Sequence, residues 1–253
     1  MVAEEPIAGL RLGVPKQARS GANDPAVAAA LDRAVRLYEG MGATVVEVDL
    51  PTTDYGIAAY YIVAPAEASS NLARFDGLRY GRRATLGSGE GLMELYCRTR
   101  SEGFGDEVKR RIMLGTHVLS SGYYDAYYTT ALKARRKLKG DFDSVFAGVD
   151  GREGCHAVLM PASPGPAFRL GEKTADPLAM YLEDVYTVGV NLAGLPAVTV
   201  PVWSALVEGR ELPIGVQLVG PAFGEGRLLR AARMLERVSG WEGRTAPWGA
   251  GAS

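Results

Sequence analysis

The sequence contains 253 residues, of which 47% are hydrophobic and 23% charged, the composition of an ordinary soluble globular protein. The formal net charge of −1 excludes an overall field that would attract nucleic acid or an anionic membrane. No run of about 18 apolar residues occurs, and the acidic start Met1–Pro6 is unlike a signal peptide. Cys97 and Cys155 form no CxxC pattern, which is typical of reduced thiols. We therefore expect a cytoplasmic protein with no membrane segment.

The first fifty residues predict a β-α-β unit. Leu10–Val14 alternates like a short strand, and Thr44–Leu50 alternates in the same way. Between them, Asp24 is a good N-cap and Pro25 a good first residue for an amphipathic helix. Two strands joined through a helix over about 40 residues indicate parallel strands with a right-handed crossover.

A helical pattern within Gly103–Leu119 places one arginine at the edge of a core. Val108, Ile112, Gly115 and Leu119 recur at helical spacing and form one stripe. At roughly 100° per residue, Arg110 points away from this stripe, while Arg111 falls about 60° to one side of Val108. Arg111 is therefore expected where a cation can meet a partially buried ligand or a structural partner.

A second helical pattern follows Ser120–Gly122 and ends in basic residues before Gly140, a natural helix-terminating glycine. Its first two turns carry four tyrosines, for which we expect core packing with the hydroxyls at the rim. The basic end is interpreted as a solvated helix terminus. The tyrosines are Tyr123, Tyr124, Tyr127 and Tyr128.

The remaining elements complete an α/β pattern, which we interpret as one domain. Asp54–Ala64 is helical until Pro65 breaks or kinks it, and Arg79–Gly91, with four glycines and three arginines, is a loop. Further strands and helices are expected at Glu67–Phe75 (helix), Cys155–Ala162 (strand), Asp176 onward (helix), Val198–Val202 and Ile214–Val219 (strands) and Arg227–Val238 (helix). Residues 239–253, rich in glycine and alanine, resemble a tail.

Several common catalytic motifs are absent from the sequence. His117 and His156 stand alone and outside any metal-ligand spacing, so a metal site is not expected. The sequence contains no GxxxxGK[ST], no GxGxxG and no GxSxG. Nothing in it therefore favours a nucleotide site or a Ser-His-Asp hydrolase.

A carboxylate occupies a position where an apolar residue would be expected. In the helix expected from Asp176 onward, Asp184 shares one stripe with Met180, Thr187 and Asn191, roughly within 60°. A buried carboxylate requires a cation or several hydrogen-bond donors, and Arg111 is an available cation. Two alternatives remain: a structural ion pair, or a clamp in which Arg111 takes a carboxylate and Asp184 an ammonium.

Four segments carry a resemblance to a known family. They are AYYIVAPAEASSNLARFDGLRYG (Ala59–Gly81), SEGFGDEVKRRIMLGTHVLSSGYYDAYY (Ser101–Tyr128), DPLAMYLEDVYTVGVNLAGLPAVTVP (Asp176–Pro201) and PIGVQLVGPAFGE (Pro213–Glu225). Together they resemble the A subunits of glutamyl-tRNA(Gln) amidotransferases, a branch of the amidase signature family. The resemblance runs from Leu10 to about Val238 and corresponds to the C-terminal half of the family's protein. It implies a mixed β-sheet flanked by helices, the C-terminal half of an amidase signature domain.

The resemblance also implies an activity for the whole complex. The family hydrolyses glutamine with a Ser-cis-Ser-Lys triad from a glycine- and serine-rich segment of its N-terminal half. No such segment occurs here, and neither Ser69-Ser70 nor Ser120-Ser121 is flanked by glycine on both sides, so no catalytic residue is assigned in this chain. The implied partners are the B and C subunits of the amidotransferase, and tRNA is bound indirectly through the B subunit. The B subunit uses ATP and magnesium, and no cofactor is expected in this chain.

Matching segments residue by residue assigns the substrate-binding side chains. The arginine that holds the substrate carboxylate falls on Arg111, and the aspartate that takes the α-amino group falls on Asp184. A pocket tyrosine falls on Tyr60, with Tyr61 beside it. The sequence departs from the family around Asp150–Gly154, where it is longer. The alternatives are another amidase signature hydrolase acting on a simple amide, or a non-catalytic module that binds an amino acid or a partner protein.

Overall fold

The computed structural model describes residues 9–148, 153–173 and 177–241. Where the sequence suggested one domain, the chain divides into two compact units. The first comprises Met1–Ile57 and Arg136–Ser253, and the second comprises Ala58–Arg135. The boundaries between the units fall inside two helices, α2 (Gly56–Asn71) and α5 (Thr130–Ala147).

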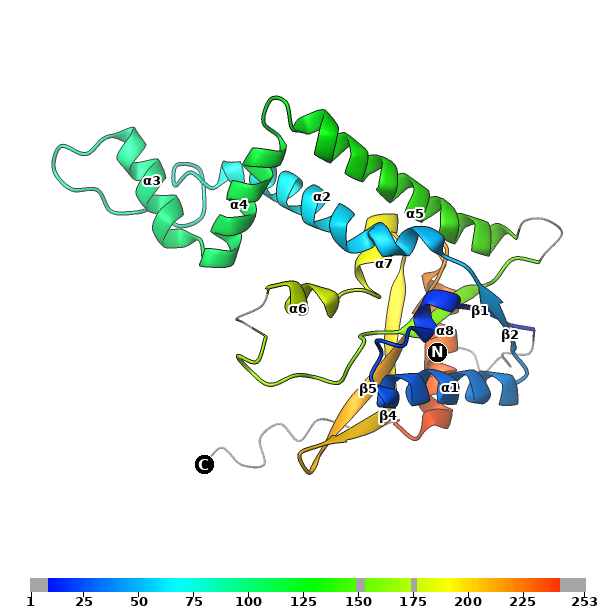
Figure 1. Cartoon of the computed structure of the whole chain (residues 1–253). Helices are drawn as coiled ribbons and strands as arrows, with labels where there is room; N and C mark the ends of the chain where they lie inside the picture. Colours follow the sequence, from blue (N-terminus) through cyan, green and yellow to red (C-terminus); the bar gives the residue numbers. More distant parts are fainter. Residues whose placement is uncertain (1–8, 149–152, 174–176, 242–253) are drawn as a thin grey trace. The chain divides into compact units, whose positions relative to one another are not determined.

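The first unit is built on a five-stranded mixed sheet (Figure 1). Its strand order is β2-β1-β3-β5-β4. Strand β1 runs parallel to β2 and β3, whereas β5 runs antiparallel to β3 and β4. The predicted mixed sheet is thus confirmed. Its strands are β1 (Arg11–Pro15), β2 (Thr44–Val48), β3 (Ala157–Pro161), β4 (Ala197–Val207) and β5 (Arg210–Val219).

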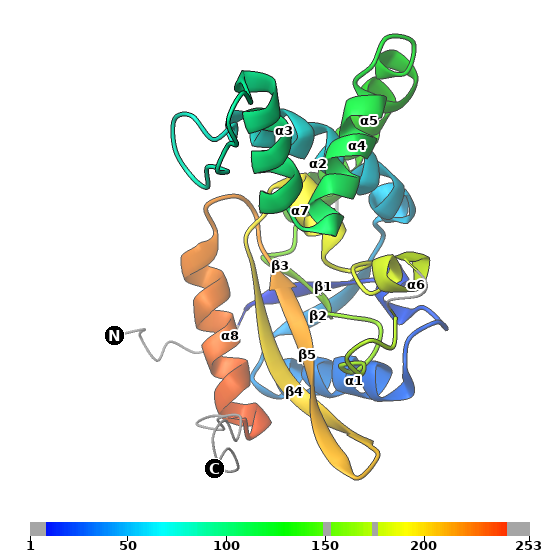
Figure 2. The same cartoon turned by 90° about the vertical axis from the view of Figure 1, so that its left-hand side faces the viewer.

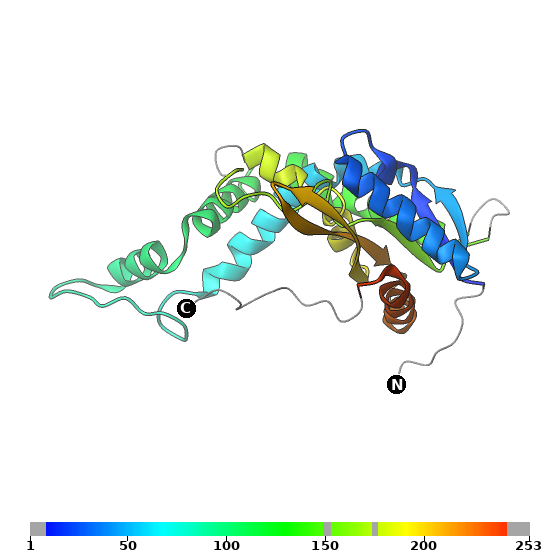
Figure 3. The same cartoon turned by 90° about the horizontal axis from the view of Figure 1, so that it is seen from below.

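The predicted β-α-β unit is present at the N-terminal side of this sheet. Helix α1 (Pro25–Gly40) starts where expected, and the Asp24 carboxylate accepts a hydrogen bond of 2.7 Å from the amide of Ala26. Its buried face includes Leu31 and Tyr38, and α1 runs beside β2 (Figure 3). Helix α8 (Glu225–Ser239) packs against α1 and β4.

Strands β4 and β5 form a hairpin that is longer than its apolar runs suggested (Figure 2). The turn residues Glu208 and Gly209 both have positive φ, 51° and 77°, as a tight two-residue hairpin turn requires. The sequence prediction stopped short because the outer part of the hairpin is solvent-exposed, including Leu206 at 78%. Hydrogen bonding along the strands, and not burial, extends the pairing there.

Two short helices and the end of α5 complete the first unit. They are α6 (Pro177–Leu182), α7 (Val188–Ala193) and the α5 residues from Arg136 to Ala147. A Cβ added at Gly56 would lie 3.3 Å from Val188 and 3.7 Å from Leu138. Helix α5 continues through Gly140, where the sequence predicted its end. Leu138 and Phe142, each 1% exposed, bury one face across this glycine, and that packing outweighs its low helix propensity.

The second unit is helical. It contains most of α2, then α3 (Leu92–Gly103), α4 (Asp106–Val118) and a π-helical turn, Tyr124–Thr129, that leads into α5. Helix α2 continues through Pro65, so the break that the sequence prediction allowed does not occur. Helix α4 approaches α2 closely at this point. A Cβ added at Gly115 would lie only 1.9 Å from the carbonyl oxygen of Pro65. Only glycine fits such a close approach, so the contact between the helices holds α2 together there.

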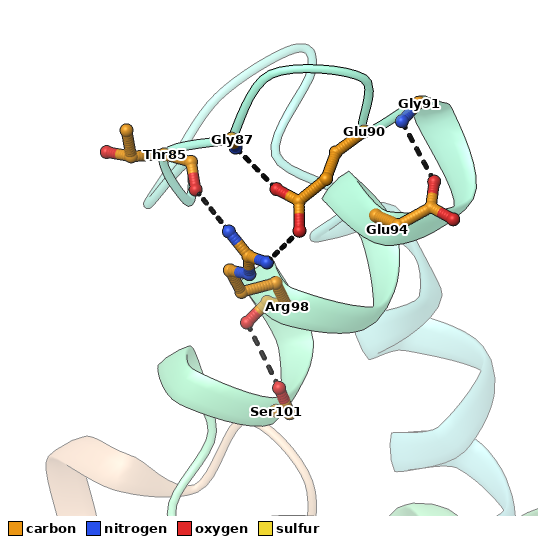
Figure 4. A network of polar contacts seen from close by, with 7 residues as sticks. All are labelled: Thr85, Gly87, Glu90, Gly91, Glu94, Arg98 and Ser101. Carbon is orange, nitrogen blue, oxygen red and sulfur yellow. Dashed lines mark hydrogen bonds and ion pairs between the residues drawn. The ribbon is translucent and has the colours of Figure 1, made fainter.

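Helix α3 was not predicted, because only a narrow stripe including Leu95 is buried. Polar contacts at its start organise the preceding loop (Figure 4). Glu94 accepts a hydrogen bond of 2.9 Å from the amide of Gly91, which satisfies a free donor of the first turn. Arg98 forms an ion pair with Glu90 and donates to the carbonyl of Thr85 at 2.8 Å. The loop prediction for Arg79–Gly91 is confirmed.

The tyrosines of the second helical pattern do not pack in a core. Tyr123, Tyr124 and Tyr127 are 42–49% exposed, and Tyr128 is half-buried. Their rings contact one another in pairs: Tyr123 stacks on Tyr127 with centroids 5.9 Å apart, and Tyr124 meets Tyr128 at a tilt with centroids 5.2 Å apart. The expectation of core packing was wrong because the segment is a π-helical turn, which changes the faces on which side chains project.

Candidate substrate-binding site

Arg111 lies where the helical pattern placed it, on the edge of α4. Arg110 is exposed and Arg111 is intermediate, with a side chain 34% exposed. Its Nε donates to Glu107 Oε1 at 2.9 Å, and Nη1 donates to the Tyr60 hydroxyl at 3.1 Å. Within the part of the chain that the structure describes, Nη2 has no hydrogen-bond partner. The guanidinium is thus oriented by two contacts and retains donors for a carboxylate.

The hydrogen bond with Glu107 keeps both groups charged. It is the largest cause raising the pKa of Arg111, ahead of the contact with Tyr60, and it also lowers the pKa of Glu107. Both side chains are about a third exposed or more, and ion pairs of this kind stabilise a fold by roughly 1 kcal/mol or less. An incoming carboxylate can therefore compete with or join Glu107 at little cost.

Tyr60 and Tyr61 lie beside Arg111 on α2. Both are half-buried, and their rings meet edge to face with centroids 5.0 Å apart. Such a pair is stiff and presents one hydroxyl to the arginine. The structure therefore brings together Arg111, Tyr60 and Tyr61, three of the four residues assigned from the sequence.

Asp184 belongs to the other unit, so its predicted approach to Arg111 stays a prediction. The continuous helix predicted from Asp176 is wrong: α6 and α7 are separated by a turn at residues 183–187 that contains Asp184. Asp184 is exposed, so its carboxylate is not a buried charge that requires a partner. The helix is interrupted because Tyr186 is buried and anchored to residues of other elements.

A cavity of about 850 Å³ lies next to this turn in the first unit. Pro15 at the end of β1, Leu50 after β2 and Met160 near the end of β3 contribute to its wall. In open α/β sheets, the carboxyl ends of parallel strands are the usual place for a ligand. Glu183 and Val185, the two neighbours of Asp184, also line this cavity.

One serine of each serine pair forms a local hydrogen bond through its hydroxyl. Ser69 Oγ donates to the carbonyl of Ala66 at 2.8 Å, and Ser120 Oγ donates to that of His117 at 2.6 Å. These are the local bonds that serines form to the preceding helical turn. His156 Nδ1 accepts a hydrogen bond of 2.9 Å from the amide of Arg11.

The residues that the structure describes contain no group of three or more histidine, cysteine, aspartate or glutamate side chains that could hold a metal ion. None of their helices is both long enough and apolar enough to cross a bilayer.

Comparison with known proteins defines the class. The family model described as Amidase matches residues 3–229, which is most of the sequence, and the chain belongs to this family. It is 53% identical over 235 residues to the A subunit of glutamyl-tRNA(Gln) amidotransferase from Geobacter metallireducens, covering 93% of this chain and 46% of that protein. The corresponding protein of Marinobacter nauticus is 50% identical over 240 residues, with 95% and 47% covered.

A solved structure agrees with these relatives. The A subunit of glutamyl-tRNA(Gln) amidotransferase from Thermotoga maritima matches with a TM-score of 0.66 and 37% identity, covering 92% of this chain and 43% of that chain. The chain therefore spans about half the length of the relatives it matches. The predicted family resemblance is confirmed.

Gln217 and Asn23, whose side chains hold Tyr186 in the Asp184 turn, were not predicted from the sequence. Gln217 Nε2 donates to the carbonyl of Tyr186 at 2.9 Å, and the Tyr186 hydroxyl donates to Asn23 Oδ1 at 2.7 Å. A glutamine in the otherwise apolar run of Ile214–Val219 was the available signal, since a buried amide needs partners.

Proposed function

We propose that this chain supplies the amino-acid-binding part of a glutaminase site, in a complex that converts Glu-tRNA(Gln) to Gln-tRNA(Gln). The observation that carries the proposal is the half-buried guanidinium of Arg111, held by Glu107 and Tyr60 with a donor to spare. Such a group recognises a carboxylate through two parallel hydrogen bonds. The identity with the amidotransferase relatives supports glutamine as the ligand.

In this proposal each assigned residue has one role. Arg111 binds the α-carboxylate of glutamine, Asp184 binds its α-ammonium, and Tyr60 with Tyr61 forms the wall between. The side-chain amide then projects toward catalytic serines and a lysine supplied by the other half of the family's protein. This chain contributes recognition, and its own residues move no proton in the hydrolysis.

The remaining partners follow from the same relatives. We propose that the ammonia passes to the B subunit, which activates the tRNA-bound glutamate with ATP and magnesium and contacts the tRNA. The complex is completed by the C subunit, and the cytoplasm is the compartment that holds the charged tRNA. None of these steps uses a cofactor bound to this chain.

Substrate selection tests the proposal against a hydrolase of simple amides. The chain is assembled with the N-terminal half of a related amidotransferase A subunit. The product is then assayed with glutamine and with butanamide, which lacks both α-substituents. Two charge-assisted contacts of about 1.5–3 kcal/mol each predict a kcat/KM for glutamine higher by roughly 10²-fold or more. Equal turnover of the two amides would instead favour a simple-amide hydrolase.

A further inference from the structure

Gln217 is a polar side chain in the core of the first unit. It lies on β5, is 3% exposed and stands opposite Met160 of β3 and Thr199 of β4. A buried amide without hydrogen bonds is costly, so its partners indicate what the residue holds in place.

The amide nitrogen of Gln217 has two acceptors. Nε2 donates to the carbonyl of Pro161 at 3.0 Å and to that of Tyr186 at 2.9 Å. The first bond joins strands that the backbone ladder already pairs. The second is different, because it ties the sheet to the turn that carries Asp184.

Tyr186 is held at its other end as well. Its hydroxyl donates to Asn23 Oδ1 at 2.7 Å, and Asn23 Nδ2 donates to the carbonyl of Ala18 at 3.0 Å. The tyrosine is 8% exposed, and burial raises the pKa of its hydroxyl, which keeps the group a donor. Tyr186 is thus fixed through its backbone to β5 and through its side chain to the segment before α1.

Asp184 stands two residues before this anchor. Its carbonyl accepts hydrogen bonds from the amides of Thr187 at 3.0 Å and Val188 at 2.9 Å, so its backbone is tied to the start of α7. The side chain of Asp184 projects from this turn and is exposed. The place from which the carboxylate projects is therefore set by where the turn is held.

We propose that Gln217 is a positioning residue for Asp184, which acts through the carbonyl of Tyr186 and fixes the carboxylate for a substrate ammonium. The inference rests on the proposed function, which assigns the α-ammonium of glutamine to Asp184. Gln217 itself touches neither substrate nor reacting atoms. Loss of its donor leaves the Tyr186 carbonyl unsatisfied and lets the turn shift.

The test uses two substrates that differ only at the α-carbon. Glutaramate is glutamine without the α-amino group, so its hydrolysis does not use Asp184. Gln217→Met keeps the length of the side chain and removes the donor. In the assembled enzyme, we expect the preference for glutamine over glutaramate, measured as a ratio of kcat/KM values, to fall about tenfold, mainly through KM for glutamine.

Tyr186→Phe provides a second test of the same turn, and Ser239→Ala provides a control for stability. Tyr186→Phe removes only the hydroxyl anchor, and we expect a smaller fall of the ratio, about threefold, which serves as the test if Gln217→Met fails to fold. Ser239→Ala removes another buried hydrogen bond, to the carbonyl of Glu236 on α8, and should lower Tm without changing the ratio. A lower Tm with an unchanged ratio in both Gln217→Met and Tyr186→Phe would overturn the proposal.

Asp184→Asn separates this inference from the function on which it rests. With Asp184 in the proposed role, this variant loses most of the preference for glutamine over glutaramate. If Asp184→Asn leaves the ratio unchanged, the assignment of Asp184 fails, and the role of Gln217 fails with it. If Asp184→Asn lowers the ratio and Gln217→Met does not, only the inference about Gln217 is wrong.

Discussion

The 253-residue chain by itself is expected to show no glutaminase turnover, and assembly with the N-terminal half of a related amidotransferase A subunit is expected to restore it. A serine nucleophile needs a base to take its proton and donors to hold the oxyanion. In this chain the hydroxyls of Ser69 and Ser120 donate to the carbonyls of Ala66 and His117 instead. The relatives of this chain are about twice as long, which leaves room for the catalytic segment.

Assembly with the N-terminal half of a related A subunit should also improve the solubility of the chain. Strands β2 and β4 form the two edges of the sheet, and an open edge invites association with another chain. We therefore expect the chain to aggregate, dimerise or express poorly alone, and to give a higher soluble yield with the complementing half.

Alanine variants of Ser69-Ser70 and Ser120-Ser121 are the controls for the turnover prediction. Turnover by the purified chain that is lost in one of these variants would show that the active site has been misplaced.

Replacing Arg111 with lysine is expected to lower kcat/KM for glutamine by about 10- to 100-fold in the assembled enzyme. The planar guanidinium donates to Glu107 and Tyr60 and keeps a further nitrogen for the substrate, whereas lysine offers a single charged centre. Loss of hydrogen bonds to a charged group costs about 1.5–3 kcal/mol, and a factor of ten corresponds to about 1.4 kcal/mol.

Ammonia-dependent amidation provides the control for this substitution. Supplied ammonia bypasses glutamine hydrolysis, so the complete complex with Arg111→Lys should use it at the wild-type rate. Arg110→Lys, one position along α4 and exposed, is the matched variant and should leave both activities intact. Equal loss of ammonia-dependent activity in Arg111→Lys would mean damage to folding or assembly and not to recognition.

The elements that the sequence predicted well are those with local causes. Asp24 and Pro25 start α1 through a side-chain cap and a fixed backbone angle, both of which act within a few residues. The position of Arg111 at the edge of α4 follows from helical phase alone. Alternating runs located β1 and β2 and continuous apolar runs located β3, β4 and β5, although the exposed end of the β4–β5 hairpin lay beyond the apolar signal.

The elements that the sequence predicted wrongly depend on distant partners. Pro65 does not break α2, because Gly115 of α4 packs against it, and Gly140 does not end α5, because Leu138 and Phe142 are buried across it. The turn at Asp184 is held by hydrogen bonds between Tyr186 and residues 31 and 163 positions away. Helical periodicity carries no information about such partners, so the exposed position of Asp184 could not be predicted.

A crystal structure of the assembled enzyme with bound glutamine would test directly whether Arg111 and Asp184 hold the two ends of one substrate. We predict that the carboxylate lies about 2.8 Å from the guanidinium of Arg111 and the ammonium about 2.8 Å from the carboxylate of Asp184. The charged groups of the two residues should then be roughly 5–9 Å apart, the span of an amino acid between two hydrogen bonds. A direct ion pair between Arg111 and Asp184 with no cavity between them, or side chains on opposite faces of the sheet, would contradict the proposed recognition.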